Sequence, residues 1–261
     1  MKYIIYTALA LVIISCNKEE GEIPCIPDNL ENNLLACYPF SNGSILDISG
    51  NGHHLTNNTN ASSGVDRGGN ANCAYTFDNQ SGNAEFISTT STNFLNNLDE
   101  LSISLWYRAD SLLSNQTAFE ALVSRDSVLS CPDRYGQWSL SLYDCRKPVF
   151  GSINSVWAQN MTNFDCQQET SLRTNIWTHL TATYNSNTLE TKLYVNGVLQ
   201  FTDSGVANCG SGTVSIQDIG DLILGKQYSG SLDDVMLFNK ILDQTEIDEI
   251  ANLETCCSSI E

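Results

Sequence analysis

The chain has 261 residues, of which 41% are hydrophobic and 16% charged, a composition typical of a globular protein that can bury a sizeable core. Its 30 Asp and Glu residues outnumber its 12 Lys and Arg residues, so the formal net charge is −18. A protein this acidic repels polyanions, which excludes nucleic acid as a partner and disfavours polybasic attachment to membranes.

The first residues have the pattern of an export signal. Lys2 precedes an apolar run over residues 3–14 that is too short to span a bilayer. The run ends in Ile13-Ile14-Ser15-Cys16, which resembles the lipobox of bacterial lipoproteins. The resemblance implies that residues 1–15 are removed and that Cys16 carries the lipid anchor. An ordinary signal peptide that ends near a cysteine is the alternative.

Residues 16–32 are expected to form the lipidated cysteine and a polar linker, because they carry Pro24, Pro27 and several charged residues. Within the linker, Asn17-Lys18-Glu19-Glu20 resembles the signal that sends lipoproteins of the Bacteroidota to the cell surface. The expected location is therefore the outer membrane, with the domain exposed at the cell surface. The periplasmic face of the same membrane is the alternative.

Nine further cysteines follow Cys16, and an exported protein is expected to pair them as disulfides. They show no C-x-x-C pair and no histidine at the spacing of a zinc site. Cys25 paired with Cys256 or Cys257 would tie the two ends of the domain together, and an odd number leaves one thiol free or paired between molecules. The candidates are Cys25, Cys37, Cys73, Cys131, Cys145, Cys166, Cys209, Cys256 and Cys257.

The body of the chain has the alternation of β-strands. Within residues 101–107, the apolar residues Leu101, Ile103, Leu105 and Tyr107 fall on one face. Asn196-Gly197, between apolar runs at 191–195 and 198–201, predicts a two-residue hairpin. Strands are also expected at 180–184, 222–225 and 235–238.

One helix is expected near the C-terminus. Asp243 is placed as an N-cap with Glu246 three residues later, and Ile247, Ile250 and Leu253 share a helical stripe. Many short strands without helical crossovers predict an all-β fold, an antiparallel two-sheet sandwich with this short helix.

Several blocks of sequence resemble LamG-like (laminin G type) domains of the concanavalin A-like lectin/glucanase superfamily. They are Leu34–Phe40, Asp47–His54, Ala74–Asp78, Ser102–Tyr107, Trp177–Leu180 with Leu193–Gly197, and Gly230–Lys240. The resemblance covers residues 33–253 and implies a jelly roll in which the first and last strands are neighbours. Extra cysteines and an insertion near 126–170 depart from the family pattern, and residues 254–261 form a cysteine-containing tail.

A structural calcium ion is one expectation. Asp47-x-Ser49-Gly50-Asn51-Gly52 concentrates short oxygen side chains and glycines in one loop, as a hard cation requires. In the resembled domains, calcium often lies where this loop meets acids of the closing strand, here Asp233 and Asp234. The predicted ligands are Asp47, Asn51, Asp233 and Asp234, and a plain Asx turn with solvated acids is the alternative.

Sugar contact is a second expectation, because lectin-like sandwiches hold glycans on exposed aromatic rings. Trp157 lies in the polar insertion and Tyr228 in a Gly- and Ser-rich turn, so both are candidate ligand-binding residues. Trp157 packed beneath a disulfide loop is an equal alternative. Trp106, Trp138 and Trp177 are interpreted as core packing.

Catalytic signatures are weak. Retaining glucanases of the superfamily use Glu-x-Asp-x-x-Glu, whereas Glu246-Ile247-Asp248 lacks the third acid and falls on the predicted helix. The leading hypothesis is a surface lipoprotein with a non-catalytic module that binds glycan or glycoconjugate. Protein–protein adhesion, or a part in a surface complex, is the first alternative, and a glycoside hydrolase or its accessory subunit is the second.

Overall fold

A computed structural model describes residues 25–80, 82–110, 119–126, 136–143, 146–152, 174–204 and 220–257. Short 3-10 helices cover Glu31–Asn33, Ser41–Gly43 and Asn93–Leu95. The α-helix of these ranges is α2 (Gln244–Ala251). The strands are β1 (Leu34–Tyr38), β2 (Ser62–Val65), β3 (Ala71–Phe77), β4 (Ile87–Thr89), β5 (Glu100–Ala109), β6 (Glu120–Arg125), β7 (Trp138–Tyr143), β8 (Lys147–Ser152), β9 (Thr178–Asn185), β10 (Glu190–Val195), β11 (Val198–Ser204), β12 (Leu222–Leu224) and β13 (Gly230–Phe238).

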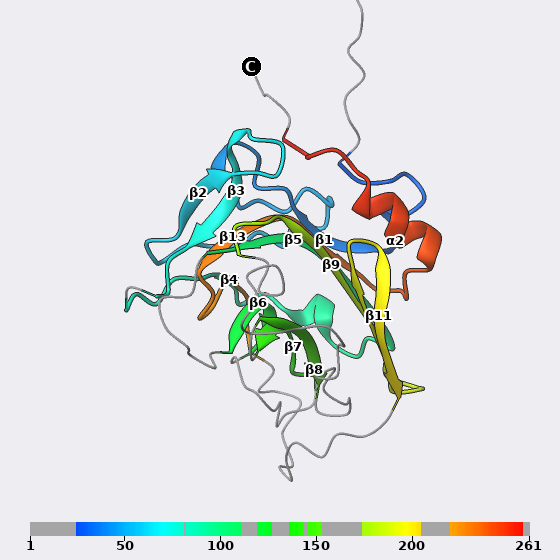
Figure 1. Cartoon of the computed structure of the whole chain (residues 1–261). Helices are drawn as coiled ribbons and strands as arrows, with labels where there is room; N and C mark the ends of the chain where they lie inside the picture. Colours follow the sequence, from blue (N-terminus) through cyan, green and yellow to red (C-terminus); the bar gives the residue numbers. More distant parts are fainter. Residues whose placement is uncertain are drawn as a thin grey trace, which may run out of the picture.

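The strands form two antiparallel sheets that face each other (Figure 1). The larger, sheet A, has eight strands in the order β11-β10-β9-β5-β13-β3-β2, with β1 also paired to β13. The smaller, sheet B, has five strands in the order β4-β12-β6-β7-β8. The predicted all-β sandwich is confirmed.

The main core lies between the two sheets, where alternate residues of each strand meet. Leu101, Ile103, Leu105 and Tyr107 of β5 all belong to it and are at most 4% exposed, as their alternation predicted. They pack with apolar residues of sheet B such as Leu140. Burial of side chains of this size, each contributing roughly 1.5–3 kcal/mol, holds the sheets together.

The hairpin predicted at Asn196-Gly197 joins β10 to β11. Both residues have positive φ, 49° and 76°, which the tight turns of twisted hairpins require. Gly197 also lies against α2, because the Gln244 side-chain amide donates to its carbonyl oxygen at 2.7 Å.

Helix α2 has the predicted N-terminal cap. The Asp243 side chain accepts from the Glu246 backbone N–H at 3.0 Å, and the Glu246 side chain accepts from the Asp243 N–H at 2.9 Å. Ile247 and Ile250 are buried in a second apolar cluster, on the face of sheet A that points away from sheet B. Sheet A is therefore covered on both faces over part of its area.

Strand β13 changes partners along its length. Its first residues pair with β3 through Leu232, whereas Val235 to Phe238 pair with β1, and β5 runs along its other edge. The pairing of β1 with β13 confirms that the first and last strands are neighbours. The partner change leaves a gap between β3 and β1 at Asp233 and Asp234, where the register with β5 also shifts.

The segment near 126–170, interpreted as an insertion, contributes regular structure as well. Its described residues include β7 and β8, which pair with each other, and β7 pairs with β6 in sheet B. No described helix has the length and apolarity needed to cross a membrane.

Candidate functional site

The outward face of sheet A carries a polar row across neighbouring strands. Arg108 of β5 lies opposite Ser231 of β13, and Ser231 lies opposite Thr76 of β3, which in turn lies opposite Ser62 of β2. Arg108 Nη2 donates to Ser231 Oγ at 3.3 Å, and the hydroxyls of Ser231 and Thr76 are 3.0 Å apart. Trp177 extends the row, because the Arg108 guanidinium carbon lies 5.2 Å from its ring centroid. We call these five residues the Trp177 row.

Most of the Trp177 row is accessible to solvent. Ser231 is buried and Ser62 exposed, whereas Thr76, Arg108 and Trp177 are partly exposed. The interpretation of Trp177 as core packing is therefore wrong: its ring lies outside both apolar clusters. Sequence reasoning missed Trp177 and Arg108, although a signal was present, because alternation with Tyr107 already places Arg108 on the outward face.

Trp106 lies on the same outward face and is also absent from the main core. Its ring contacts the His179 ring, with centroids 5.2 Å apart, and the Arg67 guanidinium carbon lies 4.8 Å from its centroid. Trp106 thus packs as predicted, but against charged and polar groups instead of the core. Trp138 is in the main core and 5% exposed, as predicted.

His179 is fully buried beside Trp106. Its Nε2 lies 2.8 Å from Ser104 Oγ, and Nδ1 has no hydrogen-bond partner among the described residues. Burial lowers the pKa of His179 to about 3, and the positive charge of Arg67 adds to this effect. The imidazole is therefore neutral at physiological pH.

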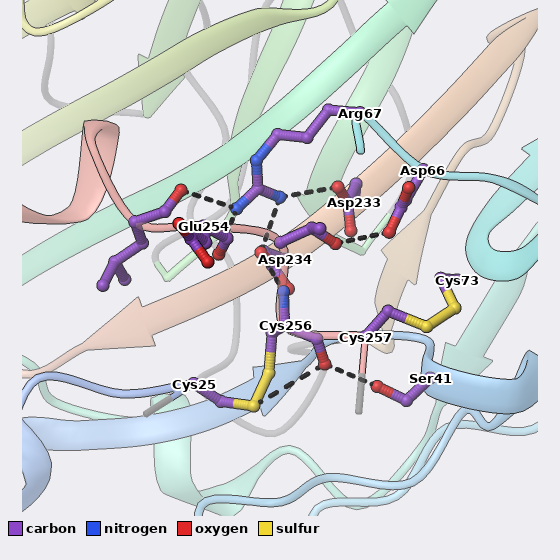
Figure 2. Close-up of a disulfide and its surroundings, with 12 residues drawn as sticks. Cys25, Ser41, Asp66, Arg67, Cys73, Asp233, Asp234, Glu254, Cys256 and Cys257 are labelled. Atoms are coloured by element: carbon purple, nitrogen blue, oxygen red, sulfur yellow. Dashed lines mark hydrogen bonds and ion pairs between the residues drawn. A yellow bond between two sulfur atoms is a disulfide. The ribbon is translucent and has the colours of Figure 1, made fainter. Parts of the chain in front are cut away.

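Arg67 lies in the turn between β2 and β3 and reaches the acids of β13 (Figure 2). Its Nη1 lies 2.6 Å from Asp233 Oδ2 and 2.6 Å from Asp234 Oδ2. Consecutive residues of a regular strand point to opposite faces, so two neighbouring acids would not normally share one partner. Asp234 has a φ of 43° at the register shift, and this local irregularity turns both carboxylates toward Arg67.

Both acids are buried, at 0% and 4% exposure. Burial raises the pKa of Asp233, the Asp234 carboxylate raises it further, and Arg67 offsets only part of the increase. Burial likewise raises the pKa of Asp234 despite Arg67. Oδ1 of each acid has no hydrogen-bond partner in the described part of the chain.

The C-terminal tail closes over this cluster (Figure 2). Arg67 Nη2 donates to the carbonyl oxygens of Leu253 and Glu254 at 3.2 and 2.9 Å. The Thr255 hydroxyl donates to the Asp66 carboxylate, and the Ser41 hydroxyl donates to the Cys256 carbonyl at 2.7 Å. Residues 252–257 are therefore held by polar contacts to the body of the domain.

Two disulfides complete this closure. We use the name clasp for these two disulfides together with residues 252–257. Cys25 pairs with Cys256, which is one of the two partners predicted for it, and Cys73 pairs with Cys257. Cys37, one of the candidate disulfide cysteines, is buried and forms no disulfide with another described residue. Burial raises the pKa of its thiol, and the charges of Asp234 and Asp47 raise it further, so the thiol stays protonated and unreactive. Cys16, Cys131, Cys145, Cys166 and Cys209 lie outside the described residues.

The Asp47 loop is an Asx-type turn saturated with internal donors. Oδ1 accepts from the backbone N–H groups of Cys37 and Ser49 at 3.0 and 2.9 Å. Oδ2 accepts from the Ser49 hydroxyl and the His53 N–H, both at 2.9 Å. Burial alone would raise the pKa of Asp47, but these hydrogen bonds outweigh it and lower the pKa. The Asn51 side chain donates to the carbonyl oxygens of β1 at Leu34 and Leu35.

These contacts do not fit a calcium ion shared by the four predicted ligands. Both oxygens of Asp47 are occupied by donors, and Asn51 presents its amide N–H groups to β1. Asp233 and Asp234 instead face the cation of Arg67. The one described cluster with metal-ligand composition is Asp66 with Cys73 and Cys257, whose two sulfurs are bonded to each other in one disulfide. Calcium binding stays a prediction from sequence.

The two predicted sugar-contact residues have different outcomes. Tyr228 is wrong as a stacking platform, because it is fully buried in the main core and its hydroxyl donates to the Ser231 carbonyl at 3.2 Å. A flat ring in a Gly- and Ser-rich turn suggested exposure, but the side chain turns inward between the sheets. Trp157 lies outside the described residues.

The Glu-x-Asp pattern has a structural role at its first position. Glu246 closes the cap of α2 and pairs with Lys240. Asp248 accepts from the Gln244 side chain at 2.8 Å on the same helix. Neither acid lies on a sheet, where the glucanase motif places its carboxylates.

Comparison with protein families identifies the fold family. Residues 79–248 match a model described as the concanavalin A-like lectin/glucanases superfamily, over more than half of the chain. The chain belongs to this superfamily. The sequence-based resemblance is therefore confirmed at the superfamily level. No curated protein sequence matches the chain significantly.

Several solved structures of botulinum neurotoxin binding domains have a similar fold. One, of neurotoxin DC in complex with rat synaptotagmin II, is 17% identical with a TM-score of 0.61, covering 85% of this chain and 52% of that chain. Another, of type C, whose cell entry depends on interaction with two ganglioside molecules, is 17% identical with a TM-score of 0.59, covering 86% and 52%. A third, of the C/D mosaic serotype, is 15% identical with a TM-score of 0.62, covering 85% and 51%. The chain thus spans about half the length of these structures, and at this identity the likeness extends to the fold alone.

Proposed function

We propose that this chain is a lipid-anchored outer-membrane protein, displayed at the cell surface, whose jelly-roll domain is a non-catalytic binding module for glycan. Membership of the lectin/glucanase superfamily supports a carbohydrate ligand. The observation that carries the proposal is the Trp177 row, a partly exposed indole beside a guanidinium and hydroxyl groups on the outward face of sheet A.

The chemistry of the row suits a sugar ring. An indole face can stack against the apolar C–H face of a pyranose, and neighbouring hydroxyl and guanidinium groups can bond to its hydroxyls. Arg108 already holds the indole in place from one side. Because the chain carries a net charge of −18, long-range repulsion favours a neutral glycan over a strongly anionic polysaccharide.

A glycan-array screen tests this proposal, using the chain from residue 17 onward, which contains every described residue. We expect binding to a subset of neutral glycans and a loss of roughly tenfold or more in affinity for Trp177→Ala, since the stacking contact is removed. Ile176→Ala is the matched control, because Ile176 is the neighbouring residue and is 52% exposed.

Three results would contradict the proposed site. The first is no glycan binding by the parent chain. The second is equal losses for Trp177→Ala and Ile176→Ala. The third is a loss for Trp157→Ala alone, which would move the ligand to the segment predicted as an insertion.

The anchor is tested separately, in cells that express the full chain. We expect the parent protein to fractionate with the outer membrane and to be degraded by protease added to intact cells. The Cys16→Ser variant should lose membrane attachment, because no acyl chain can then be added. Membrane attachment that survives this substitution would contradict lipidation at Cys16, and protection of the parent protein in intact cells would contradict surface display.

A protein partner is the second candidate, favoured by the edge of sheet A. Strand β11 is the terminal strand of the described sheet, and Val198 and Leu199 on it are 60% and 44% exposed. Exposed apolar edge strands can accept a strand from another protein. Binding of a surface protein that Val198→Lys abolishes and Trp177→Ala leaves unchanged would favour this function over the glycan module.

A further inference from the structure

Arg67 is surrounded by oxygen atoms from two separate parts of the chain. Its Nη1 contacts one carboxylate oxygen each of Asp233 and Asp234 at 2.6 Å. Its Nη2 contacts the carbonyl oxygens of Leu253 and Glu254. We call these four oxygens and the guanidinium the Arg67 cluster. Carboxylate and carbonyl oxygens are also the ligands that hard divalent cations prefer.

The cluster depends on a positive charge at its centre. Two carboxylates are buried together, and Oδ1 of each faces no hydrogen-bond donor among the described residues. A buried carboxylate without a compensating charge is strongly unfavourable, and two adjacent ones repel each other. Arg67 is the only cation in ion-pair contact with either acid in the described part of the chain, and its own side chain is just 9% exposed.

The same charge joins three segments that sequence places far apart. Arg67 comes from the turn after β2, the acids lie in the gap where β13 changes partner from β3 to β1, and the carbonyl oxygens belong to the tail. A metal ion in a jelly roll would link such segments in the same way. The sequence predicted calcium at Asp233 and Asp234, and a guanidinium lies there instead.

We propose that Arg67 is a resident cation, which takes the place of a metal ion in this oxygen cluster and makes closure of the clasp independent of calcium. The guanidinium suits this role because it stays charged at all physiological pH values and donates several hydrogen bonds in fixed directions. The inference concerns the clasp and does not rest on glycan binding.

Thermal unfolding and calorimetric titration with calcium chloride test the proposal on the chain from residue 17 onward. For the parent chain we expect a Tm that is the same in calcium and in chelator. Arg67→Ala should lower Tm in chelator by roughly 5–15 °C, because it leaves two buried acids unpaired. Calcium should restore part of that loss, since the four oxygens remain, and the double variant Arg67→Ala/Asp233→Asn should lose this response.

Two further variants separate charge from packing. Arg67→Lys keeps one positive charge, so we expect a Tm between those of the parent and Arg67→Ala and no response to calcium. Arg108→Ala is the matched control, because it removes an arginine that also stacks on a tryptophan of the same sheet face but contacts no carboxylate in the described ion pairs. It should create no calcium response.

Other results would overturn the inference. Calcium binding by the parent chain that Asp233→Asn removes would show a metal site alongside Arg67. If Arg67→Ala has a lower Tm that calcium does not raise, Arg67 is an ordinary ion-pair partner and does not take the place of a metal ion. A Tm for Arg67→Lys as low as that of Arg67→Ala would show that the charge is not what the cluster requires.

Discussion

At the scale of single residues, the outward face of sheet A is organised by stacked rings and guanidinium groups. Arg67 covers Trp106 and Arg108 covers Trp177, and His179 packs against Trp106 with its ring tilted by 51°. Cation–π contacts of this kind contribute about 0.5–2 kcal/mol each. They stabilise both tryptophan rings on a face that no second sheet covers.

His179 makes the stability of the domain depend on pH. Its pKa is about 3 when folded and near its ordinary value of 6.5 when unfolded, so the unfolded chain binds more protons between these values. The stabilisation is complete above the unfolded pKa and falls as pH decreases, by up to about 1.4 kcal/mol per pH unit. The raised pKa of Asp233 has the opposite effect, because it stabilises the folded state as pH decreases, and it does so over an overlapping pH range.

Comparison of variants isolates the histidine. We expect the free energy of unfolding, from urea titrations at about pH 7 and about pH 5, to fall less in His179→Gln than in the parent chain. Gln can still bond to Ser104, and the contributions of Asp47 and Asp233 are common to both proteins. If the free energy of unfolding falls equally in the two proteins between these pH values, His179 is not buried in its neutral form.

Sequence reasoning found the apolar residues but not these polar contacts, for a physical reason. Alternation along a strand reports which side chains avoid water, and it located the core face of β5 correctly. It does not report which distant turn will cover the other face. Arg67 meets Asp233 only because β2, β3 and β13 are neighbours in the folded sheet. No short stretch of the sequence indicates which strands will be neighbours.

At the scale of elements, the sequence predicted the features that depend on only a few adjacent residues. The Asn196-Gly197 turn and the capping box of α2 were both predicted from four or fewer residues and are both confirmed. The register shift of β13 was not predicted, because the strand was expected only at 235–238 and Asp234 lies outside that range. Its cause is tertiary: β3 ends and β1 begins along the same edge.

The N-terminal cap of α2 contributes measurably to the stability of the domain. Asp243→Ala removes the side-chain acceptor of the Glu246 N–H, and we expect it to lower the free energy of unfolding by about 1 kcal/mol. Asp243→Asn should retain most of the stability, because Asn is an equally good N-cap. Chemical denaturation checks both, and equal losses would show that the carboxylate charge, and not the cap hydrogen bond, is what matters.

At the scale of the whole molecule, the first and last described residues, Cys25 and Cys257, both belong to the clasp. The Cys25–Cys256 disulfide closes a loop with a sequence separation of 231, so it encloses nearly all the described residues. In the chain-entropy view, a cross-link over a loop this long raises the free energy of the unfolded state by about 5 kcal/mol. With the anchor proposed at Cys16, residues 17–24 would span at most roughly 30 Å between the membrane and Cys25.

The disulfide between Cys25 and Cys256 also has a mechanical consequence. A pull transmitted along the chain that precedes Cys25 reaches a covalent bond before it reaches β1, and it is shared at once with the C-terminal segment at Cys256. The strands cannot be peeled away one at a time from the N-terminus while that bond is intact. A domain tethered at one end against flow would therefore resist shear as a single body, and reduction of one bond would expose β1 to unzipping.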